Sequence, residues 1–116
     1  MDATDLNEPN ATLAAAVAVG ANDVDFGAIE WLGDDDWFAY AGVGSGMLEL
    51  KVYDLDLGIA MQVFPSSPLE SPFVVQGSIA GASVGLVPGD AFRVYSANGR
   101  AGPSVSSRYR ITTTVP

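Results

Sequence analysis

Three adjacent aspartates form the part of this sequence most suited to chemistry. The tripeptide Asp34-Asp35-Asp36 stands directly before an aromatic run that begins at Trp37. Adjacent like charges repel one another, so either water screens them or a cation neutralises them. In an extended chain, which rises about 3.3 Å per residue, Asp34 and Asp36 point to the same side about 6.6 Å apart, and Asp35 points away. Two carboxylates at this spacing can converge on one hard cation, and the alternative is a solvated acidic loop that precedes a strand.

The residue types that the chain lacks restrict its chemistry. It has no cysteine and no histidine, so it cannot build a thiol nucleophile, a zinc–thiolate site or a Ser-His-Asp triad. Two further Asp-x-Asp-x-Gly segments, 23–27 and 54–58, contain half of a calcium-binding loop, but aspartate and glycine are also the usual residues of hairpin turns. Because the sequence offers no pairing of nucleophile and base, we expect a protein that is not an enzyme.

Composition and charge indicate one acidic globular domain. The chain has 116 residues, of which 48% are hydrophobic and 16% are charged, and its net charge is −9. This length and hydrophobic content suit a single domain with a buried core. We expect no nucleic-acid partner and no membrane partner, because the chain has no basic stripe that could contact phosphates or anionic lipids. The negative charge suits cation binding or solubility.

Short alternating segments separated by turn residues predict an all-β fold. In 47–53, the apolar residues Leu48, Leu50 and Val52 alternate with polar ones, which is typical of a half-buried strand. About eight short strands of this kind fit an antiparallel β-sandwich or jelly roll. The expected strands cover 25–30, 37–43, 47–53, 59–64, 73–79 with an interruption at Gly77, 91–96 and 107–115.

The beginning of the chain is less regular. Residues 1–7 are polar and are expected to form a tail or linker before a single domain at 8–116. The segment 12–19 carries signals for both helix and strand, because its alanines favour a helix and its final Val-Ala-Val favours a strand. Both alternatives stay open for this segment.

Three aromatic residues are candidates for ligand binding. Trp31 is expected in the loop before the acidic tripeptide, where an exposed indole could stack on a sugar or contact a partner. Tyr53 and Tyr95 are expected at the edges of strands, where they could recognise collagen or another polymer. The alternatives are core packing for the tryptophan and an ordinary strand position for the tyrosines.

The cationic residues concentrate late in the chain. With Asp90 nearby, the simplest expectation is that they form cross-strand charge pairs. These residues are Arg93, Arg100, Arg108 and Arg110.

The order of several short motifs resembles a known family. An acidic opening segment, a Gly-x-Ile strand, a Gly-Asp-x-Asp-aromatic-Phe turn, a strand that ends in Tyr-Asp and two closing aromatic strands follow one another along the chain. In this order they resemble the bacterial pre-peptidase C-terminal domain, whose relatives include the collagen-binding domains of clostridial collagenases. The matching residues are Asn7-Glu8-Pro9-Asn10-Ala11, Gly27-Ala28-Ile29, Gly33-Asp34-Asp35-Asp36-Trp37-Phe38 with Tyr40, Val52-Tyr53-Asp54 with Gly58, Gly89-Asp90-Ala91-Phe92-Arg93-Val94 and Arg108-Tyr109-Arg110-Ile111.

The resemblance implies a function as well as a fold. It implies a non-catalytic jelly-roll domain of a secreted bacterial peptidase or other hydrolase, with a neighbouring hydrolase domain in the same precursor. Such a domain would aid secretion or solubility, or attach its neighbour to a protein or polysaccharide polymer. The alternative is a carbohydrate- or collagen-binding module with an aromatic binding face.

The resemblance also nominates calcium ligands. By position, the family's calcium site implies Glu8, Asn10, Asp34 and Asp36. Leu6 and Ala11 stand where the family's opening motif has acidic residues, so two carboxylates are missing. Calcium takes six to eight oxygen ligands, and Asp5, Asp35, backbone carbonyls or water would have to supply the remainder.

Overall fold

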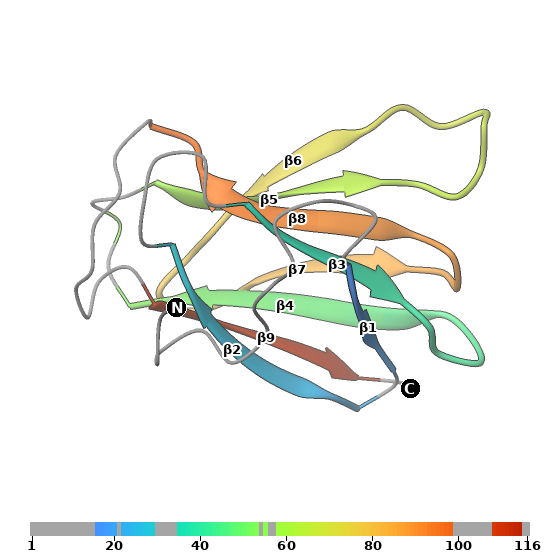
Figure 1. The fold of residues 1–116 in the computed structure, drawn as a ribbon, viewed down its shortest axis with the longest axis horizontal. Helices are drawn as coiled ribbons and strands as arrows, with labels where there is room; N and C mark the ends of the chain where they lie inside the picture. The colour runs from blue at the N-terminus through green and yellow to red at the C-terminus, as the bar shows by residue number, and fades with distance from the viewer. Residues whose placement is uncertain are drawn as a thin grey trace.

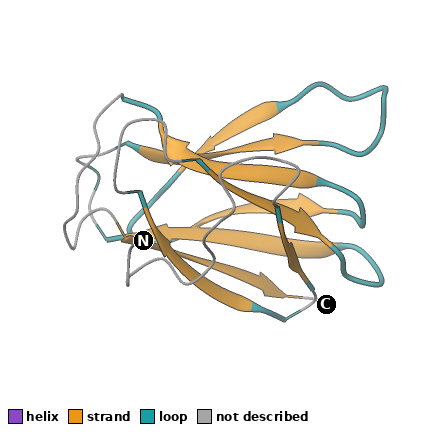
Figure 2. Cartoon of the chain, in the orientation of Figure 1, coloured by secondary structure: helices purple, strands orange, loops and turns teal. Residues whose placement is uncertain are grey.

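The protein is a two-layered β-sandwich. The computed structural model describes residues 16–20, 22–29, 35–53, 55, 58–98 and 108–114. In this part of the chain there are nine strands and no helix, and the strands form two sheets that pack face to face (Figures 1 and 2). The predicted all-β sandwich is therefore confirmed. No helix long and apolar enough to cross a membrane occurs among the described residues.

The two sheets differ in size. Sheet A has five strands in the order β1-β3-β8-β5-β6, and sheet B has four in the order β2-β9-β4-β7. All neighbouring strands are antiparallel except β1 and β3, which are parallel. The strands are β1 (Val17–Val19), β2 (Val24–Ala28), β3 (Asp36–Tyr40), β4 (Gly46–Val52), β5 (Ile59–Phe64), β6 (Phe73–Gln76), β7 (Ala82–Leu86), β8 (Ala91–Ser96) and β9 (Arg108–Thr114).

The alternation of side chains along the strands builds the core. On β4, Leu48, Leu50 and Val52 are fully buried, as the sequence pattern predicts. The Phe38 ring stacks on the Phe92 ring with centroids 5.2 Å apart, which joins β3 to β8 inside the sandwich. Each fully buried side chain of this size stabilises the fold by about 1.5–3 kcal/mol. The core cluster is Val19, Ile29, Phe38, Tyr40, Leu48, Leu50, Val52, Ile59, Met61, Val63, Leu86, Phe92, Val94, Tyr109 and Ile111.

Two segments differ from the sequence prediction. The described end of the ambiguous 12–19 segment is a strand, because β1 pairs with β3 and Val19 is buried in the core. Strand β7 was missed by the sequence pattern, because Ala82, Ser83 and Gly85 give it neither the β-branched content nor the apolar alternation of a typical strand. It forms because its backbone pairs with all but the last two residues of β4.

The predicted interruption at Gly77 marks a change of sheet. The Gly77 amide donates to the carbonyl of Ile59 in sheet A, at 2.9 Å. The Val52 amide of sheet B donates to the carbonyl of Ser78, at 3.1 Å. The chain therefore crosses from β6 in sheet A to β7 in sheet B directly after the glycine.

The close approach of β2 and β9 generates a prediction about Gly27. This glycine pairs with Tyr109, and a Cβ atom at Gly27 would collide with the Tyr109 ring and hydroxyl. The ring is fully buried in the core cluster, so moving it would disturb its neighbours there. We expect Gly27→Ala to lower the free energy of unfolding by about 1–3 kcal/mol, measured by chemical denaturation.

Gly44→Ala is the matched control for this prediction. A Cβ atom at Gly44 meets nothing within 4 Å, so its effect should stay within about 0.5 kcal/mol. Equal stability of the two variants would show that Tyr109 does not press against β2.

Candidate functional site

The acidic tripeptide contributes one carboxyl group to the interior. Asp36 is the first residue of β3, and it is fully buried. Its Oδ2 atom accepts a hydrogen bond of 2.5 Å from the hydroxyl of Tyr109, which belongs to β9 in the opposite sheet. A polar contact between the two layers therefore crosses the apolar core.

The predicted calcium ligands are placed only in part. Glu8, Asn10 and Asp34 lie outside the described residues, and Asp36 is the only one of the four that the structure places. No group of three aspartate, glutamate, histidine or cysteine side chains that could hold a metal occurs in the described ranges. One carboxyl group falls far short of the six to eight oxygens that calcium takes, so the described residues alone do not make a calcium site.

The neighbours of Asp36 point to the other side of sheet A. Asp35 precedes β3, and its carboxylate contacts the Arg93 guanidinium at 2.7 Å on the outer side of the sheet. Trp37, the next residue after Asp36, is half-buried and pairs with Arg93 in the strand register. This is the alternation that the sequence predicts for an extended chain.

The outer side of sheet A carries a group of aromatic and polar side chains that we call the aromatic face. The Trp37 ring stacks on the Phe64 ring with centroids 5.1 Å apart and an angle of 29° between the ring planes. Between β3 and β5 runs β8, where Ala91 pairs with Phe64 and leaves room for the two rings to meet. The aromatic face consists of Trp37, Gln62, Phe64, Arg93 and Tyr95.

Arg93 organises the aromatic face. Its Nε donates to Gln62 Oε1 at 2.8 Å and its Nη1 donates to Asp35 Oδ2 at 2.7 Å. The guanidinium carbon lies 4.3 Å from the centre of the Tyr95 ring, which is a cation–π contact. The three contacts fix the planar guanidinium and hold it against the Tyr95 ring.

The three aromatic residues nominated from the sequence do not share one surface. Trp31 lies outside the described residues. Tyr95 belongs to the aromatic face on sheet A, whereas Tyr53 follows the last residue of β4 in sheet B and is 43% exposed. The sequence interpretation missed Trp37, Phe64 and Arg93 as members of a surface site. Their outward direction follows from the buried positions of their strand neighbours.

The expected cross-strand charge pairs form, but Asp90 is not the partner of either arginine whose ion pair the structure defines. Arg93 binds Asp35, and Arg110 binds Glu49 across β9 and β4 at 3.3 Å. Asp90 is instead buried in the turn between β7 and β8. Its two carboxylate oxygens accept hydrogen bonds from the amides of Ser66 and Val87, at 2.8 and 3.0 Å. Asp90 therefore connects the β7–β8 turn to the segment that follows β5.

A second acidic residue lies on the inner side of an edge strand. Asp25 on β2 pairs with the buried Ile111 of β9, two residues before Gly27. Burial raises the pKa of the Asp25 carboxyl above its usual value of 3.8, and the nearby charge of Asp23 raises it further. Ionisation of this carboxyl group therefore disfavours the folded state.

Comparison with known proteins identifies the architecture. No protein family matches the sequence, and a search of curated proteins finds no match. The fold matches the crystal structure of the pre-peptidase C-terminal domain of a collagenase from Bacillus anthracis, with a TM-score of 0.61 and 15% sequence identity. The match covers 85% of this chain and 94% of the collagenase domain. The chain therefore has the fold of a pre-peptidase C-terminal domain, and the predicted resemblance is confirmed at the level of the fold.

The contact between Asp36 and Tyr109 gives a testable prediction. Tyr109→Phe removes the hydroxyl and deprives a fully buried carboxyl group of this donor, while the ring continues to fill the core. We expect the free energy of unfolding to fall by about 1–3 kcal/mol, measured by chemical denaturation. Tyr53→Phe, which makes the same chemical change at an exposed tyrosine, should shift it by less than about 0.5 kcal/mol. Unchanged stability of Tyr109→Phe would contradict a structural role for this hydrogen bond.

Proposed function

We propose that the chain is a non-catalytic accessory domain of a secreted hydrolase, and that a peptidase is the first candidate for the parent enzyme. The observation that carries this proposal is the fold shared with the pre-peptidase C-terminal domain of a collagenase. In this proposal the domain works outside the cell, and its partners are the neighbouring hydrolase domain and an insoluble polymer. Its role is to attach the enzyme to that polymer or to aid its secretion and solubility.

The absence of cysteine and histidine from the whole sequence supports a non-catalytic role. The two fully or nearly fully buried carboxyl groups also have structural partners. Asp36 is bound by the Tyr109 hydroxyl, and Asp90 is bound by two backbone amides. A glycosidase needs two carboxyl groups that act on the sugar from opposite sides of a cleft, whereas these two carboxyl groups are engaged in hydrogen bonds inside the fold.

The aromatic face supports attachment to a polymer. Flat rings with little conformational freedom provide a large contact area, and Arg93 and Gln62 provide hydrogen-bond donors beside them. A protein chain such as collagen and a polysaccharide both offer carbonyl or hydroxyl oxygens to such donors. The alternative function, a carbohydrate-binding module, would use the same face with a sugar ring stacked on Trp37.

Binding to insoluble polymers tests this role of the aromatic face. We expect the purified domain to be retained on at least one of insoluble collagen, chitin and cellulose. Trp37→Ala and Tyr95→Ala should each weaken retention about tenfold, because a buried aromatic contact at an interface contributes roughly 1–2 kcal/mol or more. Circular dichroism establishes that each variant is folded.

Tyr53→Ala is the control for the binding experiment, because it removes an exposed ring from sheet B. It should leave retention unchanged, and an equal loss for Tyr53→Ala and Trp37→Ala would contradict the aromatic face. Retention on collagen alone favours a collagen-binding role, and retention on chitin or cellulose favours the carbohydrate-binding alternative. If no polymer retains the wild-type domain, the attachment role is excluded and the secretion or solubility role remains.

Calcium binding by Glu8, Asn10, Asp34 and Asp36 remains part of the proposal. Its role would be to neutralise the acidic tripeptide and to fix the leading segment to the start of β3. We expect the melting temperature to rise when calcium is added to chelator-treated protein. A calcium concentration of about one hundred times the dissociation constant would add about 2.7 kcal/mol to the free energy of unfolding.

Glu8→Gln and Asp34→Asn should abolish the calcium-dependent rise, whereas Asp35→Asn should preserve it, because Asp35 contacts Arg93 on the outer side of the sheet. Equal melting temperatures with calcium and with chelator would contradict a calcium site in this chain.

A further inference from the structure

Only one side of the sandwich has edge strands that are protected against pairing with a further strand. Strand β1 has three residues, and β2 places the carboxyl group of Asp25 on its inner side; short edges and inward charges both discourage pairing with another strand. The edge strands on the opposite side are β6 and β7, with the sequences Phe-Val-Val-Gln and Ala-Ser-Val-Gly-Leu. Neither contains a charged residue or a proline. No further strand among the described residues pairs with their outer edges, so each can accept an additional strand.

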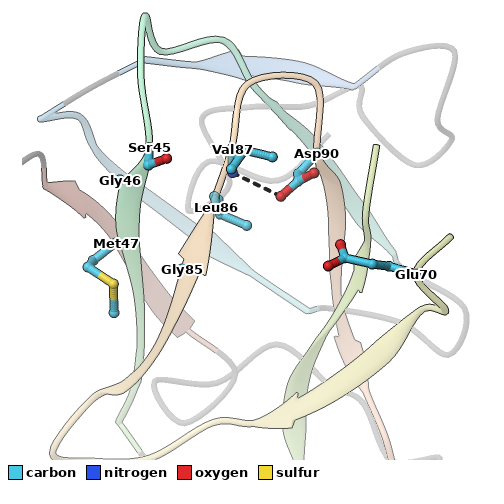
Figure 3. Close-up of a pocket in the computed structure, with 8 residues that line it drawn as sticks. All are labelled: Ser45, Gly46, Met47, Glu70, Gly85, Leu86, Val87 and Asp90. Carbon is cyan, nitrogen blue, oxygen red and sulfur yellow. Dashed lines mark hydrogen bonds between the residues drawn. The ribbon is translucent and has the colours of Figure 1, made fainter. Parts of the chain in front are cut away.

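Strands β6 and β7 diverge from a common end. They are joined by the crossover at 77–81, and Figure 1 shows them separating towards Phe73 and Leu86. Two adjoining hollows of about 350 and 400 Å³ lie at the divergent end. Both are lined by Glu70, Gly85 and Asp90, and Figure 3 shows residues of the first hollow.

Sheet B has one strand fewer than sheet A, and β7 is its edge strand beside β6. Phe73 of β6 pairs with Val63, whose side chain is buried between the sheets, so the Phe73 ring also faces sheet B. The Phe73 residue is nevertheless 40% exposed. Val87, which lines the first hollow, is 45% exposed. A further strand beside β7 would extend sheet B and cover this apolar surface.

The negative charge around the hollows indicates which kind of segment could bind beside β7. Figure 3 shows the Glu70 carboxylate pointing into the space between its own segment and β7. Asp90 adds a second carboxylate, and none of the described residues that line the two hollows is basic. A second copy of this chain, with a net charge of −9, would be repelled. An extended segment with a lysine or arginine is complementary.

We propose that β7 is a docking edge for an extended segment of another polypeptide, which adds a fifth strand to sheet B. Main-chain hydrogen bonds to β7 hold the segment, its apolar side chains cover Phe73, and a basic side chain contacts Glu70. This site is separate from the aromatic face and does not depend on the proposed function. Its failure would leave polymer attachment untouched, and the reverse also holds.

A short synthetic peptide tests the docking edge. The probe is a capped peptide of alternating valine and threonine with one central lysine, and the comparison peptide has glutamate in place of the lysine. Binding to the intact domain is measured by backbone amide shifts in NMR titrations. We expect saturable binding of the lysine peptide, with the largest shifts at β7, and binding of the glutamate peptide that is weaker by about fivefold or more.

Variants of the domain locate the site. Glu70→Gln should weaken binding of the lysine peptide about fivefold, and Leu55→Lys, which changes the net charge by the same amount at another exposed position, should not. Phe73→Ala should weaken it about tenfold, and Ile79→Ala, at an exposed apolar residue that lines neither hollow, should not.

Several outcomes would overturn the proposal. These are the absence of saturable binding, equal affinity for the lysine and glutamate peptides, and shifts that map to β1 or β2. Equal effects of a variant and its control would also overturn it. If the domain self-associates and Phe73→Ala abolishes this self-association, the edge binds a second copy of the chain instead.

Discussion

The hydrogen bond between Asp36 and Tyr109 is the polar contact on which the arrangement of the two sheets depends. It crosses an apolar core in which neither group can exchange its partner for water, so the opposed sheets must keep β3 and β9 in one relative position. The same tyrosine ring lies against Gly27 and fixes β2 at the edge of sheet B. One side chain therefore sets the spacing of three strands from two sheets.

The inward direction of Asp36 determines what faces outward. Side chains alternate along β3, so a buried Asp36 requires Asp35 and Trp37 to lie on the outer side of sheet A. There Asp35 holds Arg93, and Trp37 meets Phe64 above the small side chain of Ala91. The aromatic face is thus a consequence of the polar contact in the core, and a shift of β3 by one residue would destroy both.

The two edges of each sheet differ in how readily they can pair with a further strand. The side with β1 and β2 combines a short strand with an inward carboxyl group, and both features prevent the pairing of further strands. The side with β6 and β7 has uncharged edges, and the crossover at 77–81 holds them together at one end only. Sheet A has five strands and sheet B has four, so part of the inner apolar surface of sheet A is not covered where β6 and β7 diverge. Phe73, which faces sheet B but remains 40% exposed, belongs to this uncovered surface.

The sequence by itself determined the fold class and most of the strands, because alternation such as that of Leu48, Leu50 and Val52 is a local property of the chain. The order of its motifs also determined the resemblance that the fold comparison confirms. Strand β7 escaped prediction because its strand form depends on pairing with β4 and not on its own residues. The aromatic face and the partners of Arg93 and Asp90 were decided only by the tertiary structure. The physical reason is that hydrogen bonds and ring contacts between residues distant in sequence depend on strand register, and no local pattern records that register.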